Sequence, residues 1–193
     1  MKKLLILGVL AVASSAPAAI IQFDLRGSAG NGLLAANEPG VIVGGTGNEF
    51  NTGITFDDVT KFISISVHWG SANGYVNMTG PSTNSHLHQV ANPLGNNGTA
   101  DFMQTGTVVV NIQTDPVSFI SNTSASAGSI VGGRVLNPSE ESLLMQQRLY
   151  LNVHSAANGG GEMRGFLVIV PEPASALTGL LAVGALGLRR RRA

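Results

Sequence analysis

Apolar and polar residues alternate along short stretches of the chain, and turn-forming residues separate one stretch from the next. The clearest alternation runs from Thr60 to Trp69, where every second residue from Ile63 is apolar and the intervening positions hold serines and His68. A period of two is typical of a β-strand that buries one of its faces. We therefore expect a strand here, with His68 on its outward face.

Seven further stretches have strand-like composition and are bounded by Gly, Asn, Asp or Pro, which favour turns. They are Ile20–Leu25, Gly74–Thr79, Gly106–Ile112, Val117–Ile120, Gly128–Val135, Leu149–His154 and Met163–Val170. Such a series predicts an all-β domain, an antiparallel β-sandwich or barrel of immunoglobulin-like or superoxide-dismutase-like type. We expect Ile20–Leu25 at an edge of the sheet and a turn at residues 44–47.

One segment departs from this pattern and predicts a short helix from Pro138 to Gln146. Asn137 can cap it, Pro138 suits the first helical position, and Glu140 can return a hydrogen bond to the cap. Leu143 and Leu144 would supply its buried side. The domain is therefore expected to carry a single short helix.

The amino terminus has the features of an export signal. Lys2 and Lys3 precede the apolar run from Leu4 to Val12, and small residues ending at Ala18 follow. This order of charge, apolar run and small residues is typical of a signal peptide. We expect residues 1–18 to form a targeting helix that signal peptidase removes by cleavage after Ala18, which leaves residues 19–170 as one domain.

The carboxyl terminus predicts a second targeting segment at residues 171–193. Ala174 to Leu188 is uncharged and helix-forming, but it is shorter than a strong membrane span. Basic residues stay on the cytoplasmic side, so the cluster after it would leave the domain outside; the cluster is Arg189, Arg190, Arg191 and Arg192. We expect a transient inner-membrane anchor, separated from the domain by Pro171 and Pro173.

Val170-Pro171-Glu172-Pro173, followed by the short apolar helix and the arginines, resembles the PEP-CTERM sorting signal of exopolysaccharide-producing Gram-negative bacteria. The resemblance implies that an exosortase recognises Pro171, Glu172 and Pro173 and removes the tail. It also implies a final location at the cell surface or in the extracellular matrix, where exopolysaccharide or a matrix protein would be the partner.

The stretch LYLNVHSAANGGGEMRG, residues 149–165, predicts a hairpin that turns at residues 158–161. Tyr150, Asn152 and His154 would face outward, and Glu162 and Arg164 would form a cross-strand ion pair. Together with the preceding NPSEESLLMQQ and the upstream HLH at residues 86–88, this stretch resembles the CHRD domain. Because CHRD domains occur in exported proteins of varied role, the resemblance implies location and fold more than activity.

His86 and His88, at positions i and i+2 of a strand, share one face, and His154 would join them if its strand lies alongside. Three imidazoles are a ligand set for Zn²⁺ or Cu²⁺, and copper there would make the site redox-active; a fourth ligand would be His68, Asp101 or Glu162. We favour the interpretation that these histidines hydrogen-bond across strands, with no cofactor, and keep the metal site as the alternative.

Composition and missing motifs exclude several classes of function. The chain has no Cys, which excludes disulfides and thiolate metal sites. Residues 19–170 carry five basic and ten acidic side chains, so nucleic acid is not an expected partner. No Gly-x-Ser-x-Gly or phosphate-binding motif occurs. We expect a non-catalytic, exported module that binds or builds the extracellular matrix.

Overall fold

The computed structural model describes residues 19–94, 101–122 and 126–171. Within them the chain forms one antiparallel sheet of 11 strands, in the order β7-β6-β10-β11-β1-β4-β5-β9-β8, with the short β2 and β3 beside β1, β11 and β4. The strand bounds are β1 Ile20–Gly27, β2 Gly30–Asn31, β3 Leu33–Leu34, β4 Thr46–Asp57, β5 Phe62–Trp69, β6 Ser82–Gln89, β7 Val108–Asn111, β8 Phe119–Asn122, β9 Gly128–Val135, β10 Leu149–Ser155 and β11 Met163–Ile169.

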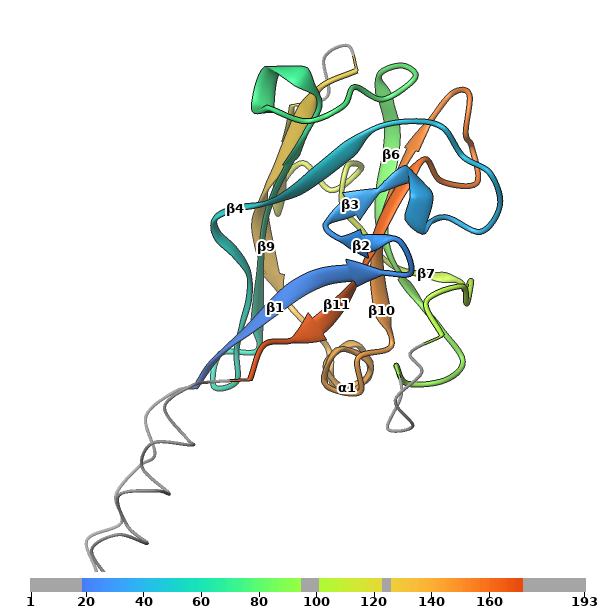
Figure 1. Cartoon of the computed structure of the whole chain (residues 1–193). Coiled ribbons are helices and arrows are strands. Elements are labelled where there is room, and N and C mark those ends of the chain that lie inside the picture. Colours follow the sequence, from blue (N-terminus) through green and yellow to red (C-terminus); the bar gives the residue numbers. More distant parts are fainter. Residues whose placement is uncertain (1–18, 95–100, 123–125, 172–193) are drawn as a thin grey trace, which may run out of the picture.

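The sheet bends around a single core, so β4 and β9 face β6 and β10 across the interior (Figure 1). Alternate residues of each strand point inward; Ile63, Ile65, Val67 and Trp69 on β5 are fully buried. Fully burying an apolar side chain contributes roughly 1.5–3 kcal/mol. The core therefore holds the two sides of the bent sheet together and confirms the predicted all-β sandwich or barrel.

The only α-helix among the described residues is α1, Pro138–Met145, which follows β9 as predicted. The Asn137 side chain accepts from the amides of Ser139 and Glu140, and the Glu140 side chain accepts from the Asn137 amide. Leu144 is fully buried, whereas Leu143 packs only partly against the core. In the described part of the chain, no helix is long and apolar enough to span a membrane.

Three local predictions are wrong. The strand expected at Gly74–Thr79 does not form. Its backbone makes separate hydrogen bonds, between Val76 and Thr46 and between Met78 and Ser126, and these do not form the ladder of a strand pair. Strand β1 is not an edge strand, since β11 and β4 flank it. The turn expected at residues 44–47 is instead extended, and β4 begins at Thr46. Strand β4 was not predicted, because its sequence does not alternate.

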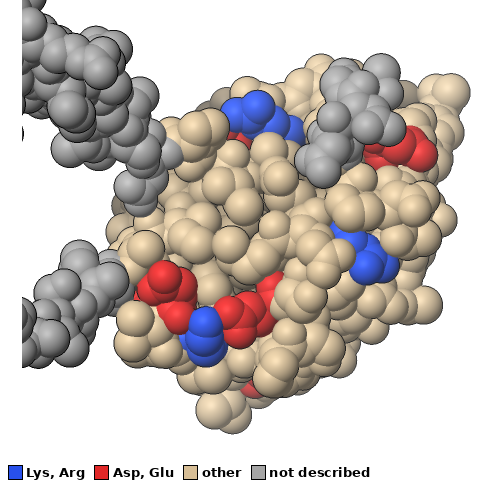
Figure 2. All heavy atoms as spheres, turned by 90° about the horizontal axis from the view of Figure 1, so that it is seen from below, with Lys and Arg blue, Asp and Glu red and all other residues tan. Residues whose placement is uncertain are grey.

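Both faces of β10 are covered, so the candidate site residues on its outward face are buried. Every residue of β10 is buried, including the polar residues of its outward face. Two stretches lie over that side of the sheet. Residues 101–106 contact His88 of β6 and Arg164 of β11, and the hairpin residues 157–161 contact His154 of β10. On the face of the molecule seen in Figure 2, by contrast, the few charged side chains are scattered over a largely uncharged surface.

Candidate metal centre

The outward face of two neighbouring strands brings three histidines together. In the antiparallel pairing of β6 with β10, Asn152 lies opposite His86 and Tyr150 lies opposite His88. His154 is two residues beyond Asn152, so it shares the same face. The register therefore places His154 of the LYLNVH sequence beside His86 and His88 of the HLH sequence, so that three imidazoles can share one metal site.

The imidazole nitrogens of the three histidines face a common space. One potential ligand atom from each of His86, His88 and His154 lies within 4.8 Å of the other two. His86 Nδ1 and His154 Nε2 are 3.1 Å apart. We call these three residues the histidine cluster.

Backbone carbonyls fix how two of the rings are protonated. His88 Nδ1 lies 3.0 Å from the carbonyl oxygen of Gly106, and His154 Nδ1 lies 3.0 Å from that of Gly159. A carbonyl oxygen only accepts, so both rings donate from Nδ1–H and carry their lone pair on Nε2. Metal-binding histidines are commonly oriented by such a bond from the other ring nitrogen.

Of these two lone pairs, that of His154 accepts from His86 Nδ1–H, and that of His88 has no partner in the described part of the chain. The Nε2 atom of His88 is buried and has no hydrogen-bond partner among the described residues. Burial lowers the pKa of His88 and His154, and burial together with the neighbouring His154 and His88 lowers the pKa of His86 to about 4. All three rings are therefore neutral at pH 7, the form that binds metal.

These positions fit a tetrahedral ion after a small adjustment. Zinc binds imidazole nitrogen at about 2.0–2.1 Å, so two ligands of one tetrahedral ion lie about 3.3 Å apart. The 3.1 Å between His86 and His154 is close to this value. The limit of 4.8 Å on the remaining pairs means that the ligand atoms must approach one another by at most about 1.5 Å.

The expected fourth ligands are not in the histidine cluster, which contains no acidic residue. His68 lies on the outward face of β5, as predicted, but stacks on Phe50 with ring centroids 4.6 Å apart. Glu162 binds the Thr79 amide and hydroxyl and the Gly45 amide instead. The described residues thus offer three protein ligands and leave a coordination position open.

Glu162 and Arg164 do not form the predicted ion pair, because each is buried against other partners. Burial alone would raise the pKa of Glu162, but hydrogen bonds from Ser155, Thr79 and Asn158 together lower it. Arg164 is fully buried and its guanidinium donates to three carbonyl oxygens, of Asn37, Gln104 and Phe102. Its nearest carboxylate belongs to Glu38, 3.8 Å away.

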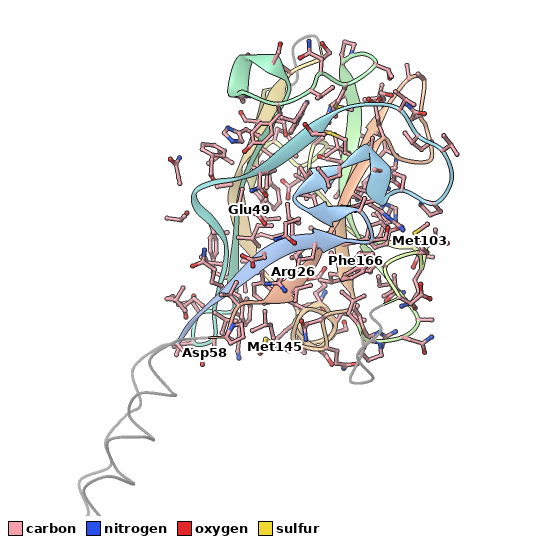
Figure 3. The ribbon with its side chains drawn as sticks, viewed as in Figure 1. Arg26, Glu49, Asp58, Met103, Met145 and Phe166 are labelled. Carbon is pink, nitrogen blue, oxygen red and sulfur yellow. The ribbon has the colours of Figure 1, made fainter. Side chains whose placement is uncertain are left out.

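Aromatic side chains continue this packing beyond the histidine cluster. The Tyr150 ring stacks on His88 with centroids 4.9 Å apart, and the Arg164 guanidinium lies 5.1 Å from the same ring centre. Phe102 packs against Phe166 at 5.5 Å; Figure 3 shows Phe166 and, nearby, Met103 of the covering stretch. The histidine cluster therefore sits in a rigid polar and aromatic layer.

Sequence reasoning missed two groups at this site. The carbonyls of Gly106 and Gly159 are backbone acceptors, which no side-chain pattern reveals. Glu38 comes from a distant loop and belongs to no motif that we singled out. Ala18 and the sorting residues from Glu172 onward lie outside the described residues, and Pro171, at their border, is exposed.

The fold and site thus define a small all-β domain that presents buried histidines on one covered sheet face. The CHRD domain family matches residues 31–167, which is most of the chain. The chain therefore belongs to the CHRD domain family. No curated protein and no solved structure matches it.

Proposed function

We propose that this CHRD domain is an exported, non-catalytic binding module that holds one transition-metal ion, Zn²⁺ or Cu²⁺, through His86, His88 and His154. The observation that carries the proposal is the unpartnered, buried Nε2 of His88 beside two other imidazoles. Leaving a buried polar atom without a partner costs about 1–3 kcal/mol. A metal ion would repay that cost.

A purely structural role for the histidines explains fewer of their contacts than a metal site does. Such a role accounts for the Nδ1 bonds of His88 and His154 and for the contact between His86 and His154. It gives no partner to His88 Nε2.

Zinc and copper both suit three imidazoles, and the hard cations Mg²⁺ and Ca²⁺ prefer oxygen ligands. Bound copper would add redox activity. We assign no catalysis to the domain, because the sequence lacks the nucleophile and phosphate-binding motifs of the common enzyme classes.

Export and surface location rest on the two terminal segments. Cleavage after Ala18 would create a positive amino group on Ala19, whose nitrogen already lies 2.9 Å from the Asp58 carboxylate. Asp58 lies where β1 and the described chain begin, as Figure 3 shows. An ion pair between this amino group and Asp58 would stabilise the beginning of a mature chain that starts at Ala19. Exosortase would then remove the tail and leave the domain with exopolysaccharide or a matrix protein.

The test is calorimetric titration with Zn²⁺ and Cu²⁺, together with elemental analysis of the purified protein. We compare the unaltered protein with the triple variant His86→Ala, His88→Ala, His154→Ala. His68→Ala is the matched control, since it removes the one histidine outside the histidine cluster. We expect one ion per chain, retained by His68→Ala and lost by the triple variant. Equal binding by the triple variant, or no binding by any protein, would refute the metal site.

A further inference from the structure

A cavity of about 510 Å³ opens beside the histidine cluster. Its floor is the outward face of β6 and β10, and its walls are the loop at residues 38–42, the stretch at 105–106 and the hairpin at 157–161. Ligand sites for small molecules commonly enclose about 300–1,000 Å³. The cavity is therefore large enough for an organic ligand, and it borders the histidine cluster at His88.

Two side chains in the cavity wall have unsatisfied oxygen atoms. Glu38 Oε1 and Asn152 Oδ1 are buried and have no hydrogen-bond partner in the part of the chain that the structure describes, and both residues are more than nine-tenths buried. Asn152 Oδ1 is an acceptor, and so is Glu38 Oε1 when its carboxyl is ionised, so at pH 8 the missing group is a donor. Because both atoms are buried, a ligand reaches them only when the side chains turn toward the cavity.

The charges near these oxygens favour a neutral donor. Arg164 lies 3.8 Å from the Glu38 carboxylate, so an ammonium group would meet a guanidinium as well as a carboxylate. An anion would meet two acceptor oxygens and would find no unpaired positive charge among the groups that line the cavity. Hydroxyl groups donate without bringing charge, and they can also accept from the Thr105 hydroxyl that lines the cavity.

We propose that this cavity binds a neutral polyhydroxylated ligand, a sugar residue of a glycan, whose hydroxyls donate to Glu38 Oε1 and Asn152 Oδ1. The Tyr150 ring already packs against His88 and Arg164, so recognition rests on hydrogen bonds rather than on ring stacking. The inference goes beyond metal binding and does not require it, although it would supply the contact through which the domain meets a polysaccharide.

The test is ligand-observed NMR on the full chain with glucose, galactose and mannose, beside the ammonium sugar glucosamine and the anion glucuronate. The blocking variant is Gly160→Trp, because Gly160 lines the cavity and a Cβ added there meets nothing within 4 Å, which leaves room to attach the larger side chain. Gly80→Trp is the matched control: Gly80 is equally open but does not line the cavity. Glu38→Gln removes the charged acceptor with little change of shape.

We expect at least one neutral hexose to bind the unaltered protein. Its affinity should fall at least tenfold in Gly160→Trp and at least fivefold in Glu38→Gln, and it should be unchanged in Gly80→Trp. Binding of no hexose, tighter binding of glucosamine or glucuronate, or equal affinities in all variants would overturn the proposal. Zinc titration of Gly160→Trp separates the two proposals, because its metal binding should match that of the unaltered protein whatever the sugars do.

Discussion

Arg164 places a guanidinium group inside the domain and ties two separate segments to β11. Its bonds to the carbonyls of Asn37, Gln104 and Phe102 hold the covering stretches over the outward face. These stretches also supply the carbonyl that orients His88. The role of Arg164 is therefore to hold the cover in place, and the histidine cluster depends on it indirectly.

Replacing Arg164 should destabilise the protein strongly. Arg164→Met leaves three carbonyls unpaired and Glu38 without its counter-charge, and breaking a buried pair in this way costs about 3–5 kcal/mol. Arg26→Met is the control, since Arg26 pairs with Asp24 at the surface and should change stability by less than about 1 kcal/mol. Urea unfolding measures both. A loss of less than 1 kcal/mol for Arg164→Met would contradict the assigned role.

Glu38 should give the domain a pH-dependent stability. Burial, partly offset by Arg164, raises the pKa of this carboxyl from 4.5 to about 7. Between these values the folded state holds a proton that the unfolded state has released. The resulting stabilisation is full below pH 4.5 and is lost as the pH rises through 7.

The measurement compares unfolding free energies of the unaltered protein and Glu38→Gln at pH 4.5, 6 and 8. The unaltered protein should lose about 3 kcal/mol relative to the variant across this range, since each pKa unit corresponds to about 1.4 kcal/mol. Other titrating groups are common to both proteins and cancel. Parallel pH profiles would show that Glu38 is not perturbed.

For single residues, the sequence predicted which side chains belong to the site better than it predicted which groups those side chains contact. His86, His88 and His154 were predicted as one group from strand periodicity and a motif, and they do lie together. The Glu162–Arg164 pair was wrong because a two-residue spacing shows a shared face but not what covers that face. Glu38 lies 126 residues from Arg164 in the chain and could not be linked to it without the fold.

The hairpin between β10 and β11 owes its shape to one glycine. Gly161 has φ 131°, and a Cβ there would lie 2.4 Å from Asn152 Nδ2 and 2.7 Å from Glu38 Oε1. Non-glycine residues rarely adopt this backbone conformation, and the neighbours leave no room for a side chain. The hairpin consequently brings the Gly159 carbonyl to His154 and places Glu162 among its partners.

Two neighbouring glycines allow a controlled test of this hairpin. Gly161→Ala should cost at least about 2 kcal/mol through backbone strain and crowding. Gly160→Ala should be neutral or stabilise by up to about 1 kcal/mol, because its added Cβ meets nothing and its φ is outside the positive range. Thermal and denaturant unfolding report both. Equal effects of the two substitutions would contradict the assignment to Gly161.

Elements with a regular pattern were predicted, and irregular ones were missed. Helix α1 carries its whole capping box in the sequence, and β5 alternates without interruption. Strand β4 has a register shift between Glu49 and Ile54, which breaks its period. Gly74–Thr79 has strand-like composition but no neighbouring strand to pair with, so tertiary context overrode local preference.

For the whole molecule, the bent sheet explains why polar residues of an outward face are buried. Alternation along β10 correctly separated its two faces, but the second face is covered by stretches that have no strand pattern of their own. Family membership was predictable from motifs in the last third of the domain, and residues 31–167 confirm it. The covering layer turns a surface that would have been exposed into a candidate binding site.

Metal binding should stabilise the folded domain as a whole. An ion that binds only the folded state adds about 2.7 kcal/mol at a free concentration one hundred times its Kd. We expect zinc to raise the unfolding temperature of the unaltered protein and of His68→Ala, and to leave the triple histidine variant unchanged. A similar rise in the triple variant would place the stabilising ion elsewhere.

X-ray absorption spectroscopy of the metal-loaded protein tests the central claim most directly. We expect three imidazole nitrogens at about 2.0–2.1 Å from the ion, with a non-protein ligand completing the shell. His86→Ala should reduce the imidazole count to two. A shell made only of oxygen atoms, or an imidazole count that His86→Ala leaves unchanged, would contradict a metal centre formed by His86, His88 and His154.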